Sequence, residues 1–203
     1  MKILDFDLDQ YECILFDLDG TLIDSMPYHN EAWMKAFSDH GVTIDQKFLD
    51  ETAGMASTRI VGIVNERFTK NLDPKELSAY KRNIYLENID KVKPFTPVMD
   101  IVKKYHNKIP LGIVTGSSHA VVDFLLPKLE IAHYFDSIVC SDDTELGKDS
   151  IAPYELSKKH LNINLKNSLF LDDGDVGLRG AKLAGMDVIH LDIHHPAIYL
   201  KSF

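Results

Sequence analysis

The sequence predicts an α/β fold, a Rossmann-like parallel sheet with an inserted α-helical cap domain. Two observations predict it. Short apolar runs alternate with helical patterns over the second half of the chain, which is typical of βαβ units in a parallel sheet. Another apolar run lies near the N-terminus, and a long stretch with helical spacing separates it from the others. We therefore expect a sheet domain over 1–23 and 92–203 and a helical domain over 24–91.

Five strands are expected in the sheet domain, each a short apolar run. They cover residues 13–17, 111–115, 137–140, 168–171 and 187–191. The helical patterns between and before the later strands are centred on Ile101, Val121, Leu156 and Ala181. Parallel strands joined by helices place their carboxyl ends at one edge of the sheet, where ligands bind. The residues at the strand ends are therefore the first candidates for function.

The inserted domain begins with a helix that starts at Ser25, has Pro27 in its first turn and ends at 40–41. Trp33 and Phe37 lie one turn apart on this helix, and we expect both to be buried.

Three further helices complete the inserted domain. One begins near Gln46, and the last begins at Asp73, with Pro74 in its first turn and Glu76 as a capping-box acid. The helix between them carries an apolar stripe made of Ile60, Ile63, Val64 and Phe68.

Composition limits the possible partners. The 203 residues, 45% hydrophobic and 26% charged, can bury one good core, or one core and a small accessory domain. The 22 basic and 31 acidic residues give a net charge of -9, which argues against nucleic acid or an anionic membrane as the main partner. An anionic substrate would need a locally positive site.

The cysteines and the N-terminus indicate a cytoplasmic protein. Cys13 and Cys140 lie in apolar runs without metal or redox spacing, so we expect reduced, buried thiols. Residues 1–10 contain three aspartates and no long apolar stretch, which predicts neither a signal peptide nor a membrane span.

The strand ends carry four carboxylates, a hydroxyl and an ammonium group. Alternation along the first strand aims Asp17 and Asp19 the same way, and two like charges are costly there unless a cation lies between them. A divalent metal with a phosphate nearby supplies that reason. The other members of the set are Thr115, Lys148, Asp172 and Asp173, which lie at or after the ends of later strands.

This set of motifs resembles the four motifs of the haloacid dehalogenase-like superfamily. The likeness runs from Tyr11 to Asp192: Asp-x-Asp-Gly-Thr after a strand, a Thr ending a later strand, a Lys, and an acidic pair. A helical insertion directly after the first motif is similar to the subfamily with an α-helical cap. Segments 24–29, 32–33, 115–117 and 184–186 resemble β-phosphoglucomutase-like sugar phosphatases, especially the bacterial fructose-1-phosphate phosphatase type.

The resemblance implies an aspartyl-phosphate mechanism. Asp17 would attack the phosphorus atom, and Asp19 would protonate the leaving sugar oxygen and then take a proton from the hydrolytic water. Mg²⁺ would be held by Asp17, the backbone carbonyl of Asp19 and Asp173, with Asp172 in support. The implied phosphate-binding groups are Thr115, the amide of Gly116 and Lys148.

Substrate choice is expected to depend on the cap. The candidate substrate contacts are His29, Trp33, Ser57 and Arg59, which suit a compact, hydroxylated leaving group such as a hexose. The resemblance places Ser57 at the position of the cap arginine that binds phosphate in β-phosphoglucomutase. Because this chain lacks that arginine, we prefer a phosphatase to a mutase. Asp19 argues against a dehalogenase, which needs neither a second aspartate nor a metal. These residues do not choose among fructose 1-phosphate, glucose 6-phosphate, 2-deoxyglucose 6-phosphate, glucose 1-phosphate and smaller polyol phosphates.

The chain departs from the family pattern at two places. Lys148 is followed by Asp149 and residues 150–152, where relatives have Pro-x-Pro-Asp, so Asp149 can pair with Lys148 and weaken its grip on phosphate. Gly174 replaces the usual serine after the acidic pair. His194 and His195 are expected to be solvated tail residues.

We therefore expect a Mg²⁺-dependent phosphatase acting on a small phosphorylated metabolite. A monomer is expected, because a cap must open and close. Two alternatives stay open, a β-phosphoglucomutase-type phosphosugar mutase and a non-catalytic phospho-ligand-binding protein on the same scaffold. The binding protein would be expected to have lost Asp17 or Asp19, and both are present.

Overall fold

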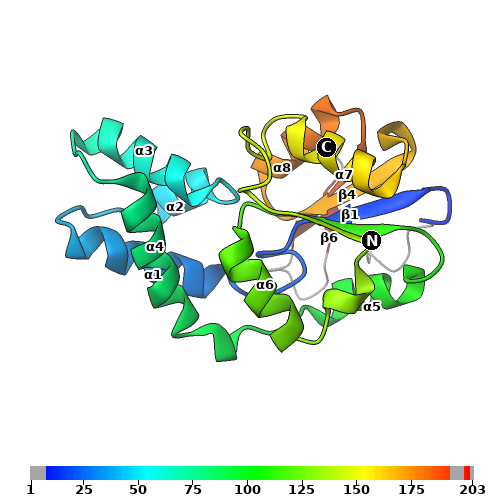
Figure 1. Ribbon diagram of the computed structural model, residues 1–203, viewed down its shortest axis with the longest axis horizontal. Helices are drawn as coiled ribbons and strands as arrows, with labels where there is room; N and C mark the ends of the chain where they lie inside the picture. Colours follow the sequence, from blue (N-terminus) through cyan, green and yellow to red (C-terminus); the bar gives the residue numbers. More distant parts are fainter. Residues whose placement is uncertain (1–7, 193–198, 202–203) are drawn as a thin grey trace.

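A six-stranded sheet forms the centre of the molecule (Figure 1). The computed structural model describes residues 8–192 and 199–201. The strands are β1 (Cys13–Phe16), β2 (Leu111–Val114), β3 (Ser137–Val139), β4 (Ser168–Asp172), β5 (Asp187–Asp192) and β6 (Tyr199–Lys201). Their order is β3-β2-β1-β4-β5-β6, with β1 to β5 parallel and β6 antiparallel to β5. The expected parallel sheet is confirmed.

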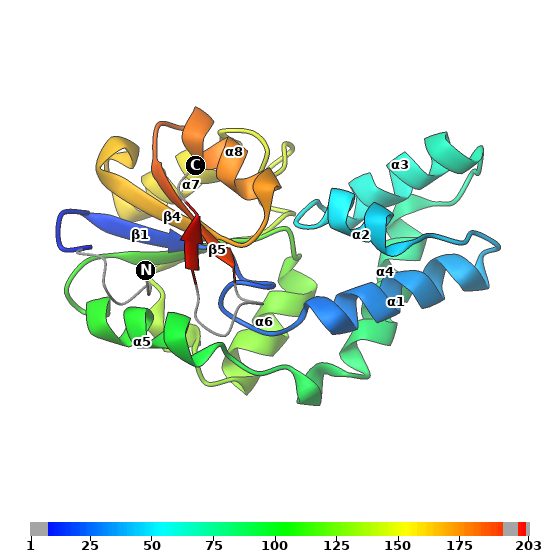
Figure 2. The same ribbon diagram turned by 180° about the vertical axis from the view of Figure 1, so that it is seen from behind.

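Helices cover both faces of the sheet and also form a separate unit beyond one end of it (Figures 1 and 2). Those on the two faces are α5 (Thr96–Tyr105) and α6 (His119–Lys128) on one side, and α7 (Ala152–Leu161) and α8 (Asp175–Leu183) on the other. The separate unit, called the cap below, contains α1 (Met26–Asp39), α2 (Gln46–Thr52), α3 (Ser57–Phe68) and α4 (Pro74–Leu86). Short 3-10 turns are η2 (Ile89–Lys91), η3 (Ala132–Tyr134) and η4 (Leu165–Asn167).

Strand β1 is buried on both faces. Ile14 and Phe16 belong to an apolar cluster shared with α5, α6 and the cap, whereas Leu15 packs in a second cluster with Tyr154 of α7 and Leu178 of α8. Because successive side chains of a strand point to opposite faces, a strand covered on both sides reads as a continuous apolar run. This burial explains why the strand can be recognised from the sequence.

The cap helices agree with the sequence-based prediction except in two details, one capping hydrogen bond and one buried position. Asp73 caps α4 by accepting hydrogen bonds from the amides of Lys75 and Glu76. Ser25 precedes α1 but makes no capping hydrogen bond. In α3, Phe68 is 37% exposed, and Val61 is buried instead. Phe68 is the last residue of α3, so no further turn of the helix extends beyond it.

Two antiparallel linker segments join the cap to the sheet domain. The Asp24 amide donates to the Lys93 carbonyl at 2.8 Å, and the Phe95 amide donates to the Leu22 carbonyl at 2.9 Å. A paired linker of this kind is suited to hinge bending, because few backbone positions have to change.

The remaining expectations concern single residues. Cys13 and Cys140 are buried free thiols, as expected. His194 and His195 lie outside the described residues. Within residues 8–192 and 199–201, we find no helix with the length and apolar character that crossing a membrane requires.

Candidate active site

The strand ends bring one lysine between two aspartates. Asp17 directly follows β1, Asp172 ends β4, and Lys148 lies in the loop after β3. The Lys148 Nζ atom donates to Asp17 Oδ1 at 2.6 Å and to Asp172 Oδ2 at 3.0 Å, and all three residues are buried. Burial alone would lower the pKa of Lys148, but the charges of Asp17 and Asp172 raise it well above its ordinary value. The lysine is therefore a fixed positive charge.

A third carboxylate completes this group. One oxygen each of Asp17, Asp172 and Asp173 lies within 4.8 Å of the other two. The Thr21 hydroxyl donates to Asp173 Oδ1 at 2.8 Å and accepts from the Asp173 amide at 3.0 Å. Gly20 has a φ of +92°, and a Cβ atom there would lie 2.4 Å from Asp173 Oδ2. Only glycine leaves Asp173 room to approach.

The three carboxylates fit a hard divalent cation. Burial and the charge of Asp172 raise the pKa of Asp17 to about 8, although Lys148 opposes the shift. Burial also raises the pKa of Asp172 to about 6 and the pKa of Asp173 to about 6, with added repulsion from neighbouring carboxylates. The raised pKa values mean that Lys148 alone does not balance the negative charge of the three carboxylates. Mg²⁺ prefers oxygen ligands and keeps several waters, so Asp17 and Asp173, supported by Asp172, suit it.

We expect Mg²⁺ to stabilise the protein more at about pH 8 than at about pH 5.5. The raised pKa values mean that the folded protein binds protons on these carboxyls that the unfolded chain has already lost. Without metal, their contribution to stability is therefore present at low pH and falls as the pH rises through about 6 to 8. Mg²⁺ competes with those protons. At a hundredfold excess over Kd it should add about 2.7 kcal/mol, or roughly 5–10 °C in Tm.

Thermal unfolding with and without Mg²⁺ at both pH values tests this expectation. Subtracting the Tm without Mg²⁺ from the Tm with Mg²⁺ at each pH removes the effect of groups that titrate elsewhere in the protein. Asp173→Asn should lose most of the Mg²⁺ shift. Asp142→Asn, which alters a separate acidic group, should keep it. A shift of equal size at both pH values would contradict the assignment.

The side chain of Asp19 has a different set of partners, two at the start of the cap and one in the turn that follows β2. Its Oδ1 atom accepts from Ser25 Oγ at 2.7 Å and lies 3.0 Å from His29 Nε2. Its Oδ2 atom accepts from Ser117 Oγ at 2.6 Å. Burial alone would raise the pKa of Asp19, but His29 and the two hydroxyl donors hold it well below its usual range.

Lys81 of α4 extends this network into the cap. The buried Lys81 Nζ atom donates to His29 Nδ1, and an ammonium cannot accept a hydrogen bond. The ring proton therefore lies on Nε2 and is donated to Asp19. Burial lowers the pKa of Lys81 to about 8. Burial and the charge of Lys81 also lower the pKa of His29, so the ring is neutral near pH 7. It stacks on Tyr85, with centroids 4.0 Å apart.

Sequence reasoning missed Lys81, Ser25 and Ser117 as members of the site. A signal for Lys81 was available, because it falls on the buried stripe of α4 between Leu77 and Tyr85. A lysine on an apolar stripe is unusual and requires a partner. For the two serines we see no comparable signal, since a serine next to a helix start is usually a cap.

The cap closes over a small cavity between these groups. The cavity has a volume of about 60 Å³ and is lined from both sides, by Asp17, Asp19, Thr115, Gly116 and Ser117 of the sheet domain and by His29, Trp33, Ser57 and Lys81 of the cap, among others. A Cβ atom on Gly116 would lie 2.4 Å from the Gly54 carbonyl oxygen, so the cap loop touches the turn that follows β2. Since one water needs roughly 10–15 Å³ by this measure, the cavity holds a few waters and no sugar.

The structure brings most of the expected site residues together. Thr115, Gly116, His29, Trp33 and Ser57 all line the cavity.

Arg59 is the exception. It is absent from the described lining residues, and its Nη1 atom donates to Asp149 Oδ2 at 2.7 Å. The expected competition of Asp149 for Lys148 is therefore not observed, because the carboxylate is bonded to a cap arginine instead.

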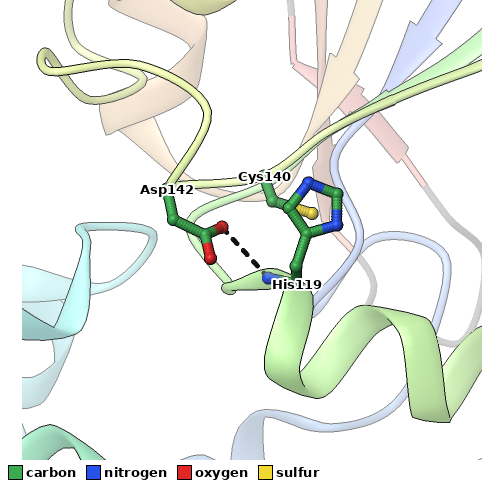
Figure 3. A group of neighbouring side chains, drawn as sticks. All are labelled: His119, Cys140 and Asp142. Atoms are coloured by element: carbon green, nitrogen blue, oxygen red, sulfur yellow. Dashed lines mark hydrogen bonds between the residues drawn. The ribbon is translucent and has the colours of Figure 1, made fainter.

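A second group of potential metal ligands consists of His119, Cys140 and Asp142 (Figure 3). The Asp142 carboxylate accepts from the backbone amide of His119 at 3.0 Å, at the start of α6. Burial and nearby carboxylates, Asp143 foremost, raise the pKa of the Cys140 thiol far above its ordinary value. A protonated thiol is a poor metal ligand. The group thus has a structural explanation as a helix start, and the three-carboxylate group is the better Mg²⁺ site.

Comparison with known proteins decides the family. The family model of haloacid dehalogenase-like hydrolases matches residues 14–191. This chain belongs to that family. The match contains all the strand-end residues described above, and the sequence-based expectations of the family and of a hydrolase are confirmed.

Similar proteins include two phosphatases and a β-phosphoglucomutase. The chain is 30% identical over 182 residues to fructose-1-phosphate phosphatase YqaB of Escherichia coli (89% of this chain, 96% of the relative). It is 27% identical to validoxylamine A 7'-phosphate phosphatase of Streptomyces hygroscopicus subsp. limoneus, over 92% of this chain and 88% of the relative. Among solved structures, β-phosphoglucomutase (pgmB) of Clostridium difficile has a TM-score of 0.79 and 25% identity, covering 89% of this chain and 84% of the other.

Proposed function

We propose that this protein is a Mg²⁺-dependent phosphatase that hydrolyses small sugar phosphates through a phosphoryl group carried on Asp17. The observation that carries the proposal is the division of the site into two sides. Lys148 and three carboxylates lie on one side, and Asp19 with its proton-donating neighbours lies on the other. The first side suits phosphoryl transfer to Asp17, and the second suits proton transfer to a leaving group.

In the first step, an Asp17 oxygen attacks phosphorus, and the bond between phosphorus and the sugar oxygen breaks. That oxygen takes a proton from Asp19. The incoming phosphoryl group brings negative charge beside Asp19, which raises the pKa of the carboxyl toward the range of a general acid. Mg²⁺ bound at the carboxylates would neutralise phosphoryl oxygens and keep the group in line with the nucleophile.

In the second step, Asp19 accepts a proton from water as the water oxygen attacks the phosphoryl group. The bond between phosphorus and Asp17 breaks and releases inorganic phosphate. Lys148, Thr115 and the Gly116 amide are the proposed phosphate-binding groups, and Lys148 supplies the local positive charge that a chain of net charge -9 otherwise lacks.

The space beside His29 and Ser117, which both bond to Asp19, supports a polar leaving group. A second hollow of about 340 Å³ shares His29, Ser57, Lys81 and Ser117 with the closed cavity and is also lined by Arg82. Hydroxyl, imidazole and ammonium groups suit the hydroxyls of a sugar. The similarity to a fructose-1-phosphate phosphatase makes fructose 1-phosphate the first compound to test.

A mutase is the second candidate, because a β-phosphoglucomutase has the same fold. Two observations favour transfer to water. Ser57 stands where the resemblance places the mutase's cap arginine, and the nearby Arg59 is held by Asp149.

A screen of sugar phosphates with Mg²⁺ tests both candidates when it scores inorganic phosphate and phosphoryl-shifted isomers together. We expect phosphate release from one or more hexose phosphates, with little isomer. Isomer formation without phosphate would establish the mutase. No reaction with any member of a broad panel, by correctly folded protein, would overturn the proposal.

A further inference from the structure

The ion pair between Arg59 and Asp149 joins the cap to the sheet domain. Arg59 lies in the first turn of α3, and Asp149 directly follows Lys148 in the loop after β3. The Nη1 to Oδ2 distance is 2.7 Å, and the two side chains are 48% and 34% exposed. The pair therefore lies at the rim of the site, where solvent can replace either partner.

This pair belongs to the closed arrangement of the cap. The cavity beneath the cap is too small for a sugar phosphate, and the Gly54 carbonyl lies against Gly116. A Cβ atom on Gly54 would lie 3.6 Å from Lys148 Nζ, so the same cap loop also covers the lysine. If the cap moves away from the sheet domain about the paired linker, α3 carries Arg59 away from Asp149.

Opening also changes the charge next to Lys148. In the closed arrangement the guanidinium of Arg59 neutralises Asp149, while Lys148 is bonded to Asp17 and Asp172. In an open arrangement the Asp149 carboxylate has lost Arg59 and adds a negative charge beside the lysine. An anionic phosphoryl group is then repelled more strongly than in the closed site.

We propose that Arg59 and Asp149 form a latch that favours the closed cap and couples closure to phosphate affinity. Arg59 is thus a positioning residue and not a substrate contact. The coupling to substrate affinity rests on the proposed phosphatase function, whereas the latch itself does not. An exposed ion pair shifts an equilibrium by up to about fivefold, and charge reversal, which adds repulsion, should shift it about threefold to tenfold.

The test uses Arg59→Glu, Asp149→Arg and the double variant that exchanges the two charges. Arg67→Glu is the matched control, because Arg67 is also in α3, is also 48% exposed and pairs with Glu51 inside the cap. Arg59→Gln is a milder variant that removes attraction without adding repulsion. All of these side chains are partly exposed, so folding should be retained, and circular dichroism checks it.

Trp33 provides a readout that needs no turnover. It is the only tryptophan of the chain, is 5% exposed and lines the closed cavity. With Mg²⁺ present, acrylamide should quench its fluorescence more in each single variant, less strongly in Arg59→Gln, and as in the wild type in the charge-exchanged variant. KM for an active phosphate ester should rise about threefold to tenfold in Arg59→Glu at nearly constant kcat and should recover in the double variant. It should rise less in Asp149→Arg, because that variant loses the latch but also removes the carboxylate that repels phosphate.

The outcomes separate the two proposals. Quenching that is unchanged in both single variants overturns the latch, as does failure of the double variant to recover, or an equal effect of Arg67→Glu. Absence of any phosphate ester hydrolysis overturns the phosphatase proposal, and the quenching series then still tests the latch alone.

Discussion

Asp17→Asn should lower kcat by at least about a thousandfold without unfolding the protein. The amide oxygen of asparagine is a poor nucleophile, and no other carboxylate in the described structure combines a bond to Lys148 with Asp17's place beside Thr115 and Gly116 in the cavity. Stability should not suffer, because Lys148 keeps its bond to Asp172 and one of three mutually repelling carboxylates disappears. Phosphate release at saturating substrate with Mg²⁺, together with Tm, measures both effects.

Asp100→Asn is the matched control for this variant. Asp100 is an exposed residue of α5 that does not line the cavity, and its replacement should leave kcat and Tm unchanged. If Asp17→Asn keeps more than roughly a few per cent of the wild-type activity, a residue other than Asp17 is the nucleophile.

Asp19→Asn should separate the two chemical steps. Asparagine cannot give up or take a proton here, so hydrolysis of a sugar phosphate should fall about 10²- to 10⁴-fold. An aryl phosphate with an acidic phenol needs no proton on its leaving group, so the first step should survive. Attack of water should then be slow, and the phosphoryl group should accumulate on Asp17.

The measurement is a burst of one equivalent of nitrophenol from p-nitrophenyl phosphate, followed by slow turnover, with a phosphoryl group found by mass spectrometry on the peptide that contains Asp17. Asp24→Asn, an exposed acid in the adjacent linker, should behave as the wild type. Equal loss on sugar and aryl phosphates without a burst would falsify the assignment of acid and base to Asp19.

Much of this site could be predicted from the sequence because strand ends are local features. A buried run such as 13–16 fixes where β1 stops, and parallel topology then brings its end together with those of β2 and β4. Asp17, Thr115 and Asp172 are therefore neighbours for reasons that are visible one segment at a time.

Contacts between elements that lie far apart in the sequence could not be predicted in this way. Lys81 reaches His29 only because α4 packs against α1, and 52 residues separate the two in the chain. The direction of the Asp149 side chain likewise depends on Arg59, which is 90 residues away. Asp149 was expected to pair with Lys148, its neighbour in the sequence, but in the folded protein it pairs with Arg59 of the cap.

The sequence alone determined the fold class, the family and the composition of the catalytic strand ends, because hydrophobic period and motif spacing are encoded locally. Only the tertiary structure decided how charge is distributed around them. It bonds Lys148 to Asp17 and Asp172, directs Asp19 toward Ser25, His29 and Ser117, and pairs Asp149 with Arg59. Electrostatic energy depends on distance and burial, and both are set when the cap folds over the sheet.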